Sequence, residues 1–139
     1  MTRIVVDASI TGLILLSDEA DWGGEAILDC LLTADLILAA HWQLEVASLL
    51  VKATRRQRLP VSERLRCFAE VDLLLAAGNV AGAAHSREIF DLAIAANLTA
   101  YDAVYLDLAI RLDATLATND DALIAAARAR GLPVLTTRT

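Results

Sequence analysis

Two acidic residues follow apolar runs of the sequence, where a structural role alone does not readily explain a carboxylate. Asp7 directly follows the β-branched run Ile4–Val6, and Asp120 follows "ATLAT", residues 114–118. Both runs are typical of short buried strands. A carboxylate at the edge of a core is costly unless a partner compensates its charge. Asp7 and Asp120 are therefore candidates for chemistry at the ends of strands.

Asp102 and Glu45 fall in segments with helical patterns, and each has two interpretations. Asp102 closes Thr99-Ala-Tyr-Asp102, which has the form of a capping box, so it is either a helix-capping residue or a ligand. Glu45 begins a helical stripe that is either a solvated polar face or a functional one. The other members of the stripe are Ser48, Lys52, Arg55 and Arg56.

The assignment of helix caps indicates which neighbouring polar residues remain available to bind a ligand. We predict that Ser9 caps the helix after the first strand and leaves Asp7 free. Thr118-Asn-Asp-Asp121 has the form of a second capping box, which assigns Asp121 to capping. Asp120 would then project from the first helical turn over the edge of the sheet.

The elements that must position these residues alternate between short apolar runs and longer helical patterns. Strands are predicted at 4–6, 36–40, 114–118 and 133–137, and helices at 9–16, 25–33, 42–58, 62–77, 86–96, 100–112 and 120–130. In helix 62–77 the spacing places Leu65, Phe68 and Leu75 toward the core, and Gly78–Gly82 is predicted as a break. This order predicts one α/β domain over residues 1–139, with a parallel sheet covered by helices on both faces. Ligands of such folds bind beyond the carboxyl ends of the strands, where Asp7 and Asp120 lie.

Carboxylates that converge at such an edge repel one another unless they are protonated or bridged by cations. Oxygen ligands without Cys or His suit Mg²⁺ or Mn²⁺. A site of this kind, completed by water and phosphate oxygens, suits metal-assisted cleavage of phosphodiester bonds.

The bulk composition favours a cytoplasmic protein that does not enter the membrane. Hydrophobic residues make up 57% of the chain, yet no apolar run reaches the length of a membrane span and no signal peptide is recognisable. The apolar surplus fits Ala-rich helices, an apolar face for a partner, or both. Cys30 and Cys67 are predicted to be buried free thiols, and a structural zinc site is not expected.

The net charge of −6 argues against broad, non-specific binding of nucleic acids. It is compatible with an enzyme that holds divalent cations, because a bound metal inverts the local field. The basic residues are partly grouped, which fits either a solvated helical face or a phosphate-binding strip. The grouped residues are Lys52, Arg55, Arg56, Arg58, Arg64 and Arg66.

Four stretches of the chain resemble the acidic motifs of PIN-domain proteins. "IVVDASI", "LEVASLL", "LTAYDAVYLDLA" and "LATNDDALIAAA" occur in the order, and at about the separations, of those motifs. The chain is most similar to the small bacterial VapC-like toxins of toxin–antitoxin pairs, over essentially its whole length. The resemblance implies a PIN-like three-layer sandwich with a five-stranded parallel sheet between helices.

The resemblance also implies which residues form the site. It assigns Asp7, Glu45, Asp102 and Asp120 to catalysis, with Mg²⁺ or Mn²⁺ held by the three aspartates. Ser9 and Thr118 match polar positions of the motifs, and Thr118 favours Asp120 over Asp121. Two departures stand out: "AAHWQ" lacks a proline common before the helix of the glutamate, and Ser48 replaces a common asparagine. Ser48 puts in doubt a hydrogen bond that would orient Glu45.

The implied activity is that of an endoribonuclease toxin acting on tRNA, rRNA or mRNA. The implied partners are a cognate antitoxin, which holds the toxin inactive, and a second copy of the chain in a homodimer. "ITGLILL" and "LEVASLLV" are apolar enough to offer a core face and also a groove for an amphipathic antitoxin helix. One alternative is a PIN-like module that binds RNA or protein without cleaving. A phosphatase of the haloacid-dehalogenase type is disfavoured, since Ser9 stands where that type needs an aspartate.

Overall fold

Strands and helices alternate through the computed structural model, which describes residues 1–16 and 23–138. The strands are β1 (Arg3–Val6), β2 (Asp35–Ala39), β3 (Asn79–Ala81), β4 (Thr115–Ala117) and β5 (Val134–Leu135). The helices are α1 (Ala8–Leu15), α2 (Gly24–Thr33), α3 (Trp42–Arg55), α4 (Arg64–Ala77), α5 (Ser86–Ala96), α6 (Ala100–Arg111) and α7 (Asp121–Ala129). A 3-10 turn, Val61–Glu63, precedes α4.

The five strands form one parallel sheet in the order β3-β2-β1-β4-β5. β1 lies in the middle, where Ile4 pairs with Leu36 of β2 and with Thr115 of β4. Because β1 is covered on both faces, its apolar run Ile4–Val6 is buried. The predicted α/β fold with a parallel sheet is confirmed.

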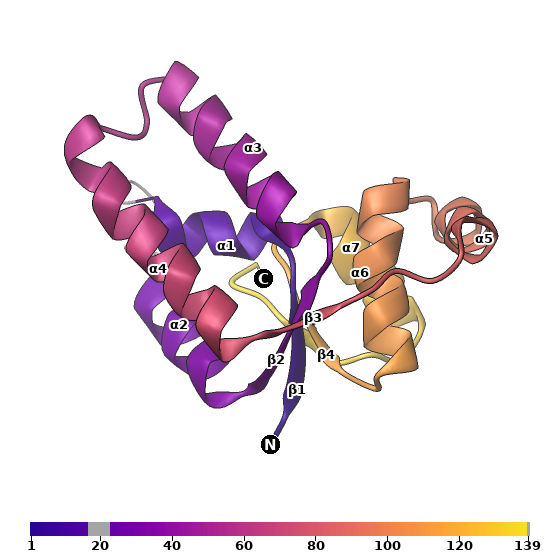
Figure 1. The fold of residues 1–139 in the computed structure, drawn as a ribbon. Helices are drawn as coiled ribbons and strands as arrows, with labels where there is room; N and C mark the ends of the chain where they lie inside the picture. The colour runs from indigo at the N-terminus through magenta and orange to yellow at the C-terminus, as the bar shows by residue number, and fades with distance from the viewer. Residues whose placement is uncertain (17–22, 139) are drawn as a thin grey trace.

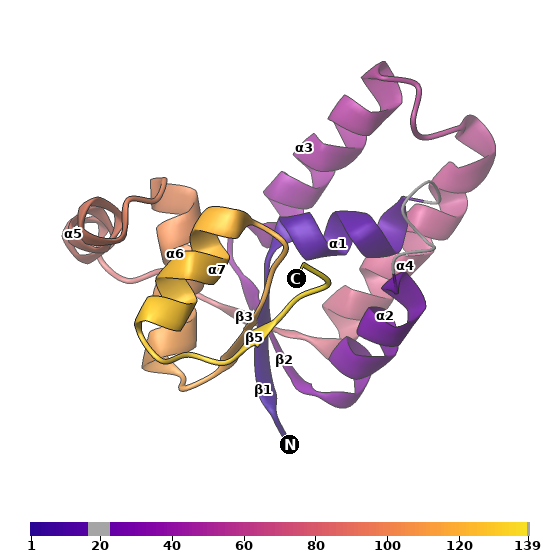
Figure 2. The same ribbon diagram turned by 180° about the vertical axis from the view of Figure 1, so that it is seen from behind.

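Helices cover both faces of the sheet and give the molecule three layers. α1, α2 and α4 lie on one side, and α5, α6 and α7 lie on the other (Figure 1, and from behind in Figure 2). α3 and α4 extend together beyond the carboxyl end of the sheet as an arm (Figure 1). The starts of α1, α3, α6 and α7 gather at that same end (Figure 1).

α1 passes close to α3 at a glycine. A Cβ placed on Gly12 would lie 2.8 Å from Cδ1 of Leu49, so the absence of a side chain permits this approach. Residues 10–16 are all buried within the chain. The stretch "ITGLILL" therefore supplies core, and its Gly12 and Leu16 also line a groove between α1 and α3.

The structure corrects the predicted inward face of α4. Leu65 is 87% exposed and Phe68 is 52% exposed, whereas Leu75 is partly buried. The core face consists of Cys67, Val71 and Leu74. Two apolar stripes of helical spacing coexist on this helix, so periodicity alone could not choose between them.

Three smaller expectations also meet the structure here. The predicted break at Gly78–Gly82 contains the edge strand β3, whose Val80 is exposed. Cys67 is a buried free thiol as predicted, but Cys30 is exposed. In the described part of the chain, no single helix is long and apolar enough to cross a membrane; α5 and α6 meet that test only as a pair bent by 98°.

Candidate functional site

Asp7 caps α1 directly after β1. Its backbone is extended (φ −93°, ψ 174°), and its Oδ1 accepts a hydrogen bond from the backbone N–H of Ile10 at 3.1 Å. The predicted cap, Ser9, lies instead inside the first turn and donates from Oγ to the Asp7 carboxylate at 2.8 Å. The prediction was wrong because the cap lies two residues earlier, where the extended backbone of Asp7 already has cap geometry.

The Asp7 carboxylate is almost completely buried, with 3% of the residue exposed. Burial raises its pKa to about 6, against the lowering effect of hydrogen bonds from Thr118, Ile10 and Ser9. The charge of Asp102 raises this pKa further. Three donors meet a carboxylate that can accept about four hydrogen bonds, so one acceptor position is left for a further partner.

Thr118 connects the carboxyl ends of β1 and β4. Its buried hydroxyl donates to Oδ2 of Asp7 at 2.5 Å and accepts from the backbone N–H of Asp120 at 3.0 Å. Ser9 Oγ lies 3.3 Å from the same hydroxyl and accepts from the Asn119 N–H. Thr118 and Ser9, both predicted as site residues, therefore lie beside Asp7.

Asp120 is the N-cap of α7, with Oδ1 accepting from the Leu123 N–H at 2.9 Å. The prediction gave this role to Asp121. Asp121 is instead exposed in the first helical turn and forms an ion pair with Arg138 at 3.0 Å. Both aspartates suit the positive end of a helix, and the extended backbone of Asp120 decides which one caps. The cap uses one oxygen of Asp120 and leaves the other available.

Asp102 lies in the first turn of α6, partly buried. Thr99 Oγ1 accepts from the Asp102 N–H at 3.1 Å, so Thr99 is the cap. Burial raises the pKa of Asp102, and the charges of Asp120 and Glu45 raise it further. Asp120 and Glu45 are therefore close enough for their charges to act on Asp102.

Glu45 is held by two side chains that the sequence did not single out. The buried Tyr105 donates its hydroxyl to Glu45 Oε1 at 2.6 Å, and His41 Nε2 lies 3.2 Å from the same oxygen. The imidazole approaches outside the hydrogen-bond direction, and its Nε2 has no well-aligned acceptor in the described structure. His41, then Tyr105, and more weakly Lys52 hold the pKa of Glu45 below its usual range, against burial.

Tyr105 resolves the question raised by Ser48. In the described residues no hydrogen bond joins Ser48 to Glu45, and Tyr105 orients the glutamate instead. Tyr105 stands three residues after Asp102 and therefore shares its face of α6, a spacing that could have identified it. Its aromatic type at a helical core position gave no reason to expect a polar role.

The predicted acidic residues thus gather from the starts of α1, α3, α6 and α7 at the carboxyl end of the sheet (Figure 1). Among the described residues, no three His, Cys, Asp or Glu side chains lie close enough to hold a metal ion as they stand. The donor types still fit a hard divalent cation, because all four are carboxylates. Burial is the largest cause of the raised pKa values of Asp7 and Asp102. Neighbouring carboxylates raise both further, since Asp102 acts on Asp7, and Asp120 and Glu45 act on Asp102. A cation would offset this excess of negative charge. The assignment of Mg²⁺ or Mn²⁺ stays a prediction.

No protein-family model and no curated protein sequence matches the chain. Its fold is similar to that of PAE2754 from Pyrobaculum aerophilum (21% identity, TM-score 0.72), over 96% of this chain and 90% of that one. It is also similar to a chain of VapBC2 from Rickettsia felis, solved bound to a DNA fragment from their promoter (14% identity, TM-score 0.62, 97% and 98% covered). A chain of FitAcB from Neisseria gonorrhoeae gives 19% identity and a TM-score of 0.62, with 96% and 97% covered. At these identities the likeness concerns the fold, and it confirms the PIN-like α/β architecture that the motifs implied.

Proposed function

We propose that the chain is a Mg²⁺- or Mn²⁺-dependent endoribonuclease of the VapC-like toxin type. Asp7, Asp102 and Asp120 would hold the cation, and Glu45 would bind it directly or through water. The observation that supports this most is the meeting of four carboxylates from four separate elements at the carboxyl end of a PIN-like sheet. The site lies where ligands of parallel α/β folds bind.

The chain's own residues would divide the work of hydrolysis. Glu45, ionised and oriented by Tyr105, would accept a proton from a water molecule whose oxygen bonds to phosphorus as the bond to the leaving oxygen breaks. Solvent would supply the proton that the leaving oxygen takes up. Asp7 is fixed in orientation by Ser9, Thr118 and the α1 backbone. A bound divalent cation would supply the charge that stabilises the phosphate and that lowers the pKa of water.

A cognate antitoxin is the protein partner we propose. The shared fold with chains of VapBC2 and FitAcB and the resemblance of the motifs support it. A homodimer rests on the resemblance alone. Light scattering of the purified chain is expected to give twice its mass of 14.9 kDa, and a mass of 14.9 kDa would contradict the dimer.

Cleavage of a single-stranded RNA in Mn²⁺ or EDTA tests the nuclease assignment. Asp120→Asn removes a proposed ligand, whereas Asp121→Asn makes the same change one residue away, on an exposed side chain outside the site. We expect cleavage in Mn²⁺ only, a loss of about 100-fold or more in Asp120→Asn, and near wild-type rates in Asp121→Asn.

Two outcomes would count against the proposal. Equal cleavage by the wild type and Asp120→Asn would place the activity elsewhere. A wild type that binds RNA but never cleaves it would favour the non-cleaving PIN-like module.

A further inference from the structure

A groove between α1 and α3 leads away from the acidic site. It has a volume of about 480 Å³, and Ser9, Glu45 and Tyr101 line the end next to the carboxylates. Leu44, Leu49 and Gly12 form part of its walls. The far end is lined by Lys52, Arg56 and Arg58. The groove is therefore continuous with the candidate site and changes from acidic to basic along its length.

The change of charge follows the axis of α3. Lys52 lies seven residues after Glu45, about 10 Å along the helix, and Arg56 follows one further turn away. In the described part of the chain, neither Lys52 nor Arg56 has a carboxylate within ion-pair distance, whereas Arg66 and Arg111 are paired with acids. Phosphates next to a cleavage site would meet these cations after passing the carboxylates.

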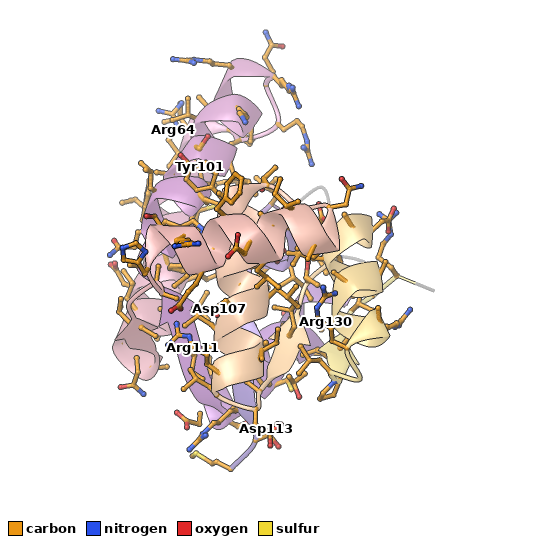
Figure 3. All side chains as sticks on the ribbon, turned by 90° about the vertical axis from the view of Figure 1, so that its right-hand side faces the viewer. Arg64, Tyr101, Asp107, Arg111, Asp113 and Arg130 are labelled. Carbon is orange, nitrogen blue, oxygen red and sulfur yellow. The ribbon has the colours of Figure 1, made fainter. Side chains whose placement is uncertain are left out.

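An aromatic ring stands at the acidic end of the groove. Tyr101 is 63% exposed, and its ring centroid lies 5.7 Å from that of His41. It lies toward the end of the molecule from which α3 extends, whereas Arg111 and Asp113 lie toward the opposite end (Figure 3). Exposed aromatic rings of this kind bind single-stranded nucleic acids by stacking on their bases.

We propose that this groove binds a short single-stranded RNA segment, with one base stacked on Tyr101 and the neighbouring phosphates bound by Lys52 and Arg56. The proposal deepens the proposed function by naming the form of the substrate and the residues that position it. A groove of this volume suits one small ligand, comparable in size to a nucleotide. Stacking on Tyr101 needs an unpaired base, which favours a single strand. The cations offset the repulsion that phosphates meet in a chain of net charge −6.

Binding measured without cleavage tests this inference independently of the nuclease activity. A labelled RNA oligonucleotide is titrated with the protein in EDTA at several salt concentrations, and fluorescence anisotropy gives the dissociation constant. The double variant Lys52→Ala/Arg56→Ala is compared with Arg128→Ala/Arg130→Ala, which removes the same charge from α7 and the turn after it, away from the groove.

The groove variant is expected to weaken binding and to lower the slope of log affinity against log salt by about 1.4, because two phosphate contacts are lost from a single strand. The control double variant should keep the wild-type slope. Tyr101→Ala should weaken binding about tenfold, and Tyr101→Phe should restore it.

Several results would overturn the proposal. One is equal RNA affinity and salt slope in the wild type and the groove variant; another is duplex RNA binding as tightly as single strands. A third is a protein that binds an acidic peptide through Lys52 and Arg56 but binds no RNA. That result would make the groove a site for a protein partner. Weaker RNA binding by the groove variants would support the proposal even if no variant cleaved RNA. Unchanged RNA binding would contradict the proposal even if Asp120→Asn abolished cleavage.

Discussion

The carboxylate of Asp7 is costly to ionise because it is buried. The same side chain caps α1 and is a proposed metal ligand. Its pKa is raised from 3.8 to about 6, chiefly by burial, which corresponds to about 3 kcal/mol of lost stability when the carboxylate is ionised. Three hydrogen bonds do not compensate that cost. A neutral residue of the same shape would avoid it.

Asp7→Asn should therefore stabilise the metal-free protein in a pH-dependent way. Between about pH 4 and pH 6 the unfolded wild type releases a proton that the folded state retains, so the wild type loses stability over that window. The variant has no such group, and its advantage should grow from near zero at pH 4 to about 3 kcal/mol at pH 7. Urea unfolding of both proteins in EDTA across this range measures the difference. A difference that does not vary with pH would refute this account of Asp7.

Tyr105→Phe isolates the hydrogen bond that orients Glu45. The change removes only the hydroxyl that lies 2.6 Å from Glu45 Oε1. Hydrogen bonds to charged groups contribute about 1.5–3 kcal/mol, so we expect kcat to fall about tenfold or more with little change in KM. The acidic limb of the pH–rate profile should also move to higher pH, because Tyr105 helps to hold the Glu45 pKa down. An unchanged profile would show that Tyr105 does not act through Glu45.

Single residues were predictable where their position in an element was unusual. Asp7 and Asp120 stood out because carboxylates rarely end buried runs, and the structure places both at the predicted edge of the sheet. Their capping role was missed because Ser and Asp are nearly equal caps and a helix boundary is uncertain by one or two residues. The contact between Tyr105 and Glu45 joins residues 60 positions apart, and no local pattern announces it.

At the scale of the elements, the fit of α1 against α3 depends on Gly12. Gly12→Ala would push against the end of the flexible Leu49 side chain, which also lines the groove. The contacting atoms are the end of a flexible side chain, and alanine favours a helix over glycine by about 1 kcal/mol. We therefore expect the overpacking to cancel that gain and the groove wall to shift. Gly82→Ala is the control for a position where nothing lies within 4 Å of a Cβ. Chemical denaturation measures the stability of both variants, and a Gly12→Ala protein more stable than the wild type by the full helix gain would contradict the close packing.

Elements with one clear apolar pattern were predicted well, and those with two patterns or none were not. β1 and α5 match their predicted residues closely, because each has a single buried face or run. α4 carries two apolar stripes, and only contact with its neighbours selects the one that faces inward. β3 is a short exposed edge strand whose sequence has no strand pattern. It is extended because it pairs with β2.

In the molecule as a whole, acidic and basic side chains lie at opposite ends of one continuous groove. The acids gather at the carboxyl end of the sheet, and the groove between α1 and α3 leads from them to Lys52 and Arg56. The alternation of strands and helices already predicted a sheet covered on both faces, whereas the fifth strand was predictable only through the resemblance to PIN-domain proteins. Solved structures with the same fold confirm that part.

The central claim is that the four carboxylates form one site for a divalent cation. Its most direct test is a Mn²⁺ titration of the wild type, Asp120→Asn and Asp121→Asn by calorimetry, with melting temperatures recorded alongside. Because a ligand that binds the folded state stabilises it, Mn²⁺ should bind the wild type and Asp121→Asn and raise their melting temperatures. Asp120→Asn should show neither effect. Equal binding by all three proteins, or none by the wild type, would contradict the account.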